Sequence, residues 1–333
     1  MQTASLPRLS DALRLHEVTR MTASADLDEH VHASLDQLIR LQLQASGFSF
    51  LPNQPIYSQL AGRHESRLRG RGLDFDELRH YRPGDDIRNL DWKVTNRTGK
   101  PHVRCYREER EREVLLVVDQ RLSMFFGSQV RMKSVVAAEL AALACWRVLK
   151  AGDRSGALLF NDSEIVEFKP RRNRRSQLRM LGRLCDMNKA LKAGSGVEPA
   201  PAMLNKALAS AERIVNHDWL VVIISDLSGW DAQTVQRIKT MSRHNDVIAG
   251  FVFDPLEQEL PAGDALVASD GIWQLQFDPG KADLRDRFAH GFRNTVDALR
   301  SELRKHAVPF VPVNTIDPVV NQLRQAIGEA VAR

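Results

Sequence analysis

Residues 114–119 read VLLVVD, an unbroken apolar run followed by an aspartate. A run this short, without polar alternation, is typical of a strand whose two faces are both buried. Residues 131–150, RMKSVVAAELAALACWRVLK, follow with the length of a helix that is apolar almost all round. A buried strand leading into such a helix predicts the first unit of an α/β fold.

The same alternation continues to the carboxyl end of the chain. Further strands are predicted at residues 155–160, 164–170, 218–226, 246–254, 272–277 and 308–313, with 164–170 closing a hairpin and 272–277 at an edge. Helices are predicted at residues 174–187, 201–215, 231–244, 282–306 and 321–333. Strands separated by helices imply parallel crossover connections. The expected fold class is therefore α/β, a doubly wound and mostly parallel sheet between two layers of helices.

Two segments precede this domain, which spans residues 113–333. Residues 1–60 predict an N-terminal arm and an amphipathic helix, because apolar residues recur at helical spacing within residues 26–45. Residues 61–112 are rich in charge and are predicted to form a motif segment packed on the main domain.

Composition limits the possible functions. The chain has 333 residues and a formal net charge of +5, which is too mild to support general binding of polyanions. Its three cysteines show no Cys-x-x-Cys spacing, which favours a reducing compartment. The first residues lack the apolar run of a secretory signal, and no window approaches the roughly 18 apolar residues of a membrane span. The sequence thus predicts a cytoplasmic protein without an integral membrane segment.

Residues 70–97 read GRGLDFDELRHYRPGDDIRNLDWKVTNR, with opposite charges dense around aromatic residues. This density indicates paired side chains that fix the geometry of a loop. The stretch also resembles the domain-of-unknown-function family fifty-eight, although Asn96 stands where that family more often has Ala. The residues that carry the resemblance are Gly70, Gly72, Phe75, Arg79, Tyr81, Gly84, Asp85, Asp86, Arg88, Asp91, Trp92 and Arg97.

The resemblance implies a fold and a class of partner. Members of this family carry a von Willebrand factor A-like domain, so that fold is expected for the main domain. They resemble partners of MoxR-class AAA+ ATPases in protein assembly or remodelling, often with other von Willebrand factor A proteins at the membrane. The expected function is a non-enzymatic protein-interaction module, an adaptor or partner of such an ATPase.

Von Willebrand factor A domains commonly bind Mg²⁺ at a metal-ion-dependent adhesion site, through Asp-x-Ser-x-Ser, a Thr and a second Asp. Here the first loop runs from Asp119 to Ser123 with Arg121 at the middle position, Ala202 stands at the Thr position, and Asp226 is the second Asp. A guanidinium repels a divalent ion and can satisfy both carboxylates. The sequence therefore predicts a degenerate site without metal, filled by an internal Arg–Asp cluster. The alternative is that Arg121 points into solvent and the two aspartates cap helices.

The expected working face combines Asp119, Arg121, Ser123 and Asp226 with the motif loop 79–92, and Arg121 is expected to pair with an acidic side chain of the partner. Within the loop, extensive pairing and a buried Trp92 are expected. The paired residues would be Arg79, Asp85, Asp86, Arg88 and Asp91.

Other chemistry has weaker support in the sequence. Nucleotide-binding and hydrolase motifs are absent, so no cofactor and no catalytic residue is expected. Asp85 and Asp86 follow a Pro-Gly turn, which favours capping of the loop over catalysis. The basic run 169–183 offers an alternative function, polyanion or nucleic-acid binding, but it lacks aromatic residues for base stacking, so nucleic acid is disfavoured. Its basic patch comprises Arg171, Arg172, Arg174, Arg175 and Arg179.

Overall fold

The computed structural model describes residues 29–45, 73–108, 111–192, 194, 196–260, 266–269, 274–277 and 282–331. The chain divides into two compact units. The larger, here the sheet unit, consists of Met1–Pro52 and Arg112–Arg333, and the smaller, the hairpin unit, of Asn53–Glu111. Within the described ranges, no helix has both the length and the apolar character that crossing a membrane requires.

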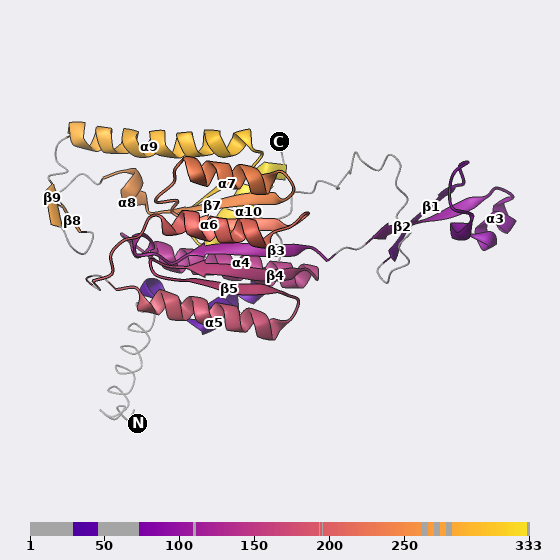
Figure 1. Ribbon diagram of the computed structural model, residues 1–333, viewed down its shortest axis with the longest axis horizontal. Coiled ribbons are helices and arrows are strands. Elements are labelled where there is room, and N and C mark those ends of the chain that lie inside the picture. Colours follow the sequence, from indigo (N-terminus) through magenta and orange to yellow (C-terminus); the bar gives the residue numbers. More distant parts are fainter. Residues whose placement is uncertain are drawn as a thin grey trace, which may run out of the picture. The chain divides into compact units, whose positions relative to one another are not determined.

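A six-stranded sheet forms the centre of the sheet unit (Figure 1). Its order is β10-β7-β6-β3-β4-β5, and every neighbouring pair is parallel except β4 and β5. The strands are β3 (Glu113–Asp119), β4 (Arg154–Phe160), β5 (Ile165–Arg171), β6 (Leu220–Ser225), β7 (Asp246–Phe253) and β10 (Phe310–Asn314). The predicted α/β class, the mostly parallel sheet and the β4–β5 hairpin are confirmed.

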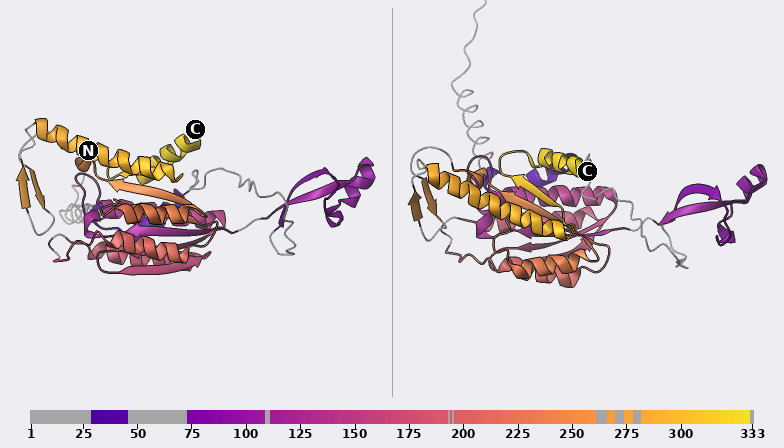
Figure 2. Two further views of the ribbon diagram at one scale, coloured as in Figure 1. Left: turned by 45° about the horizontal axis from the view of Figure 1, so that its top comes forward. Right: turned by 90° about the horizontal axis from the view of Figure 1, so that it is seen from above.

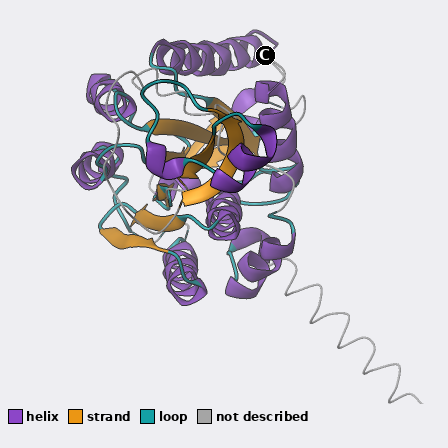
Figure 3. Ribbon diagram, turned by 90° about the vertical axis from the view of Figure 1, so that its right-hand side faces the viewer, coloured by secondary structure: helices purple, strands orange, loops and turns teal. Residues whose placement is uncertain are grey.

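Helices cover both faces of this sheet, as the end-on view of Figure 3 shows. One face carries α4 (Lys133–Ala151), α5 (Arg174–Ala190) and α10 (Val319–Val331). The other carries α6 (Met203–Ile214), α7 (Ala232–Ser242) and α9 (Ala282–Lys305). Figure 2 gives two further views, in which the long helix α9 lies outside the sheet.

The apolar run of β3 fills both halves of the core. Leu116 and Val118 belong to the cluster under α4, whereas Leu115 and Val117 belong to the cluster under α6. Successive side chains of a strand point to opposite faces. A central strand covered on both sides therefore needs apolar residues at every position, which is why the run shows no alternation.

Residues 29–45 form an interrupted helical segment rather than one continuous helix. α2 (Leu35–Arg40) leads into the short helix η1 (Leu41–Leu43), and Ser34 begins α2 with a capping box that it forms with Gln37. The single helix predicted over residues 26–45 is therefore wrong in its described part, and residues 26–28 lie outside that part. The segment is anchored, since the Trp146 indole N–H donates to the Leu38 carbonyl at 2.8 Å.

Short elements complete the sheet unit. These are η3 (Leu122–Met124), α8 (Pro255–Gln258), β8 (Leu266–Ser269) and β9 (Gln274–Phe277). β8 and β9 pair with each other in an antiparallel hairpin. The edge strand predicted at residues 272–277 is therefore wrong in its partner, because β9 pairs outside the six-stranded sheet.

The hairpin unit contains the charged motif. β1 (Leu73–His80) and β2 (His102–Glu108) are antiparallel, and η2 (Ile87–Asn89) and α3 (Trp92–Thr98) lie between them in sequence. The motif loop predicted at residues 79–92 thus comprises the end of β1, a turn, η2 and the start of α3. Gly70 and Gly72 lie outside the described residues.

Candidate functional site

The carboxyl ends of β3 and β6 meet at the point where the strand order reverses. From β3 the chain moves to β4 on one side and returns later to β6 on the other. Ligands of open α/β sheets bind in the crevice at such a point. Asp119 is the last residue of β3, and Asp226 directly follows β6. The structure thus brings the predicted acidic residues to one place.

Arg121 fills the centre of this place. Its side chain is only 1% exposed. Nε donates to Oδ1 of Asp119 at 3.0 Å and Nη2 donates to Oδ2 at 2.6 Å, while Nη2 lies 3.5 Å from Oδ1 of Asp226. The structure thus contains the Arg–Asp cluster that the sequence predicts. The alternative of a solvent-exposed Arg121 is wrong, and so is the expectation that this buried side chain pairs with a partner.

The same guanidinium joins three loops. Nη1 donates to the Pro201 carbonyl at 3.1 Å and to the Ser228 carbonyl at 2.9 Å. Pro201 precedes α6, and Ser228 follows β6, so Arg121 connects both loops to its own loop after β3. Ala202, at the expected Thr position, offers no side-chain cap to α6. The planar fork of five N–H donors suits arginine to this bridging role.

Asp119 is fully enclosed by donors. Besides the guanidinium, the Ser225 hydroxyl donates to Oδ2 at 2.6 Å and the Arg121 N–H donates to Oδ1 at 2.9 Å. Complete burial raises the pKa of Asp119, and Arg121 and Ser225 oppose that effect by stabilising the carboxylate. Leu227, with φ of 55°, adopts the left-handed backbone region, and its N–H donates to the Ser225 hydroxyl.

A second buried cation, Lys133, was missed by the sequence analysis. Its Nζ lies 3.2 Å from Oδ2 of Asp226 and 2.6 Å from Oε1 of Glu257. Burial alone would lower the pKa of Lys133, but these two carboxylates raise it. Burial alone would likewise raise the pKa of Asp226, yet Lys133, the Ser228 N–H and Arg121 lower it. The available signal was a lysine at the start of a mostly apolar helix.

The donor set does not fit Mg²⁺, the ion that the resemblance implies for this position. Mg²⁺ demands near-octahedral oxygen coordination. Asp119 and Asp226 are instead engaged by Arg121 and Lys133, whose positive charges oppose a divalent ion. The Ser123 hydroxyl is buried without a hydrogen-bond partner in the described structure, although it lies close enough to Asp226 to help lower its pKa. Absence of metal binding stays a prediction.

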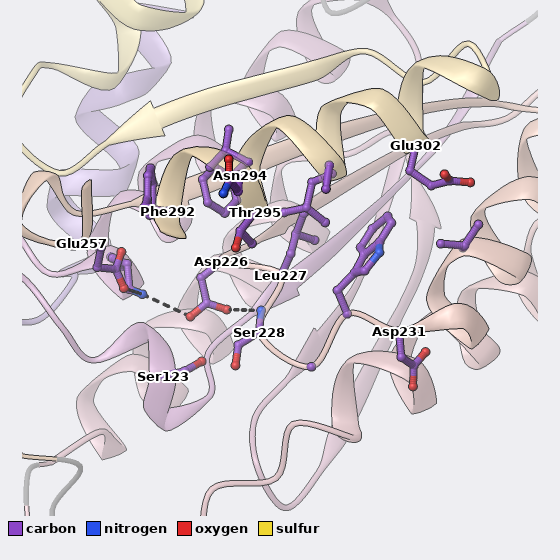
Figure 4. Close-up of a pocket in the computed structure, with 18 of the residues that line it drawn as sticks. Ser123, Asp226, Leu227, Ser228, Asp231, Glu257, Phe292, Asn294, Thr295 and Glu302 are labelled. Atoms are coloured by element: carbon purple, nitrogen blue, oxygen red, sulfur yellow. Dashed lines mark hydrogen bonds and ion pairs between the residues drawn. The ribbon is translucent and has the colours of Figure 1, made fainter. Parts of the chain in front are cut away.

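A pocket of about 1060 Å³ opens beside the cluster (Figure 4). Ser123 and Asp226 contribute to its lining. α9 forms one wall, to which Phe292 and Glu302 contribute. Arg121 is buried and is not among the described lining residues, so the pocket exposes the Asp226 side of the switch point.

The motif carboxylates of the hairpin unit fix its backbone. Asp85 accepts two hydrogen bonds from Arg79, at 2.8 and 2.6 Å, and a third from the Arg82 N–H. Asp91 caps α3 and pairs with Arg104. The Arg79 hydrogen bond lowers the pKa of Asp85, and the Val94 N–H and Arg104 lower that of Asp91. These two contacts agree with the expected pairing.

The rest of the motif differs from expectation. Asp86 accepts from the Arg88 N–H and caps η2, and among the described residues the Arg88 side chain forms no ion pair. The prediction that Trp92 is buried is wrong, because it is 62% exposed.

Two further motif residues act through the backbone. Gly84, with φ of 108°, turns the chain where other residues are strained. Tyr81 donates its N–H to the Pro101 carbonyl.

The basic patch occupies a different part of the sheet unit. Arg171 ends β5, and Arg174, Arg175 and Arg179 lie in α5. All four are exposed, as is Arg172. The patch therefore lies on elements that do not contribute to the switch-point pocket.

Asp254 is a third buried carboxylate at the carboxyl edge and predicts a pH effect. It accepts from the Ser128 hydroxyl and the Thr315 hydroxyl, both at 2.5 Å, and caps α8. Burial would raise the pKa of Asp254, but these hydrogen bonds lower it.

The lowered pKa of Asp254 stabilises the fold at pH values above the unfolded-state pKa, near 3.9. This stability is lost as pH falls through the folded-state pKa. Urea unfolding from pH 7 to 3 should therefore show a shallower loss of stability below about pH 4 for Asp254→Asn than for wild type; equal slopes would contradict this.

The sequence model of a family described as "Protein of unknown function DUF58" matches residues 77–311. Uncharacterized proteins of Mycobacterium bovis and Mycobacterium tuberculosis are each 35% identical over 240 residues, covering 71% of this chain and 73% of their own. The crystal structure of conserved hypothetical protein BatB from Bacteroides thetaiotaomicron aligns with TM-score 0.41 at 14% identity, covering 67% of this chain and 100% of that one.

Proposed function

The chain belongs to the DUF58 family, and on this premise we propose that it is a non-enzymatic protein-interaction module whose partner is a MoxR-class AAA+ ATPase. The proposal includes a von Willebrand factor A-like sheet unit, a cytoplasmic location, and other von Willebrand factor A proteins at the membrane as further partners. The observation that carries the interaction role is the accessible pocket at the switch point, next to a cluster whose charged groups are internally paired.

The pairing supports binding over catalysis. A general base or nucleophile has to reach its substrate and exchange a proton. Asp119 is enclosed by Arg121 and Ser225, and Asp226 is engaged by Lys133. Both thiols with described side chains are buried, and burial raises the pKa of Cys145 to about 12 and that of Cys185 to about 11. Neither thiol is poised as a nucleophile.

A binding measurement with a pocket-filling variant tests the proposal. Ala298 is exposed on α9 and lines the pocket, so Ala298→Trp fills the space without disturbing the core. Ala190→Trp at the end of α5 is the matched control, because Ala190 is also exposed but lies on the other face of the sheet. The wild type and the control should bind the purified ATPase, measured by biolayer interferometry with ATP, and Ala298→Trp should weaken binding at least about tenfold.

Two outcomes would contradict the proposal in different ways. If the wild type fails to bind the ATPase, or alone hydrolyses ATP, the proposed function is wrong. If Ala298→Trp binds as tightly as Ala190→Trp, the function stands but the pocket is not the docking face.

The basic patch favours polyanion binding as a second candidate. Arg171, Arg174, Arg175 and Arg179 are exposed and form no ion pair among the described residues. Substituting the two α5 residues Arg174 and Arg175 by Ser should abolish binding of generic duplex DNA, if such binding is detected, and binding should fall steeply with salt. The same variant should keep its affinity for the ATPase.

A further inference from the structure

The switch-point pocket is lined by an excess of carboxylates. Asp226, Asp231, Glu257 and Glu302 contribute to its lining, and among the lining residues that the structure describes the only cation is Lys133. Lys133 is buried and bound to two of these carboxylates, at 3.2 and 2.6 Å, so it presents no free positive charge to an incoming group. Acidic side chains therefore set the charge that a partner meets.

The ion-paired charges in and next to the pocket do not reverse this sign. Asp119, Asp226 and Glu257 are three carboxylates that share two cations, Arg121 and Lys133. This leaves one negative charge in excess.

The other two carboxylates of the lining, Asp231 and Glu302, differ in whether a cation pairs with them. Asp231 is exposed, and among the described residues it accepts from the N–H groups of Gln233 and Thr234, the Thr234 hydroxyl and the Asn205 amide and forms no ion pair, so it adds a second negative charge. Hydrogen bonds from Thr234 and Asn205 lower the pKa of Asp231. Glu302 is compensated by Lys305 at 2.6 Å.

Much of the remaining lining of the pocket is apolar. Phe292, Val296 and Leu299 line it from α9, and Phe251 lines it from β7. Phe288 lies four residues before Phe292, which places it on the same face of the helix, and it is 40% exposed. An apolar strip thus runs along α9, and Asp231 and Glu257, here called the acidic rim, contribute charge to the same pocket.

We propose that this pocket binds a cationic amphipathic segment of the protein partner, with an apolar side chain against α9 and Lys or Arg groups at Asp231 and Glu257. The inference rests on the proposed interaction function and adds the chemistry of the segment that docks. Long basic side chains suit such a site, because their methylene stems pack on apolar surface while the charged heads meet carboxylates. A site that held a metal ion would attract a carboxylate of its partner. This pocket would instead attract a positively charged group.

Paired peptides test the sign of the charge. Two short fluorescein-labelled peptides share a Leu-Phe core, and one is flanked by Lys and the other by Glu. Fluorescence anisotropy with the full chain should show binding of the Lys peptide, weakening with added salt because rim charges are screened. The Glu peptide should bind at least about tenfold more weakly. Equal affinity for both peptides would overturn the proposal.

Two substitutions remove the rim charge while keeping the local structure. Asp231→Asn preserves the oxygen that caps α7, and Glu257→Gln preserves the capping box of α8, since Asn and Gln serve at these positions. The double variant should bind the Lys peptide about tenfold more weakly than wild type. The control is Glu167→Gln with Asp186→Asn, which removes two exposed carboxylates of β5 and α5. Unchanged affinity in the first double variant, with folding verified by circular dichroism, would overturn the assignment.

Two further outcomes separate the rival explanations. If the Asp231→Asn/Glu257→Gln variant loses the Lys peptide but binds the ATPase as wild type does, the pocket takes a cationic segment of another partner, and the proposed ATPase docking there is wrong. If sedimentation shows that wild type self-associates and this variant does not, the occupant is a second copy of the chain, and the proposed heterologous partner segment is wrong.

Discussion

Replacing Arg121 by Met should lower the free energy of unfolding by about 3–5 kcal/mol, because the change leaves the Asp119 carboxylate buried beside Asp226 without its cation. The Pro201 and Ser228 carbonyls would also lose their donor, which adds to the cost. Urea unfolding followed by circular dichroism measures the difference. A loss below about 1 kcal/mol would mean that the guanidinium does not bind the three loops together in solution.

The matched control removes both charges of the pair. In Asp119→Asn/Arg121→Met no uncompensated ion from this pair stays buried, so much of the stability lost by the single variant should return. If Asp119→Asn lowers the free energy of unfolding as much in the Arg121→Met background as it does in wild type, the two side chains are not coupled.

Arg121→Ser should convert the switch point into a Mg²⁺ site. The substitution removes a positive charge 3.5 Å from Asp226 and places an oxygen ligand at the middle position of the first loop. Asp119, Ser123 and Asp226 would then supply further oxygens. A ligand that binds only the folded state at ten times its Kd adds about 1.4 kcal/mol of stability. Thermal unfolding should therefore shift upward with Mg²⁺ for this variant. An unchanged midpoint at all Mg²⁺ concentrations would show that Lys133 alone suffices to exclude the ion.

The sheet could be predicted from sequence because its central strands are buried on both faces. Runs such as residues 114–118 contain apolar side chains at every position, and the structure places them in one sheet with their predicted neighbours. The same reasoning could not identify the partner of β9. A strand of four residues carries too little pattern to distinguish the edge of the large sheet from a hairpin with β8.

The break in the predicted N-terminal helix had a local signal. Ser34 and Gln37 have the spacing of a capping box, which starts a helix rather than continuing one. The periodicity of Val31, Leu35 and Leu38 gave no indication of the break, because their spacing fits one uninterrupted helix.

Pairing within the charged motif was predictable only at short range. Arg79 and Asp85 are six residues apart and meet across one turn. Asp91 pairs with Arg104 on β2 instead of with an Arg of the motif, and this contact depends on the fold of the hairpin unit, which spacing does not reveal. Trp92 was expected to be buried as an aromatic residue amid dense opposite charges, yet α3 presents it to solvent with 62% of its surface exposed.

At the switch point, the sequence revealed the residues but not their accessibility. Asp119 and Asp226 each follow a buried run, so their convergence was predictable. The burial of Arg121 depends on the carbonyls of Pro201 and Ser228, and backbone acceptors leave no mark in a sequence. The role of Lys133 could not be predicted either, because its partner Glu257 lies far away in the sequence and meets it only in the folded chain.

Calorimetric titration of the purified wild-type chain with Mg²⁺ decides whether Arg121 stands in place of a metal. With the guanidinium bound to Asp119 and Lys133 bound to Asp226, no heat of binding is expected at physiological Mg²⁺ concentrations. Arg121→Ser, titrated in parallel, should bind the ion. Binding of Mg²⁺ by wild type that disappears in Asp226→Asn would contradict the arginine-filled site and restore a metal-dependent one.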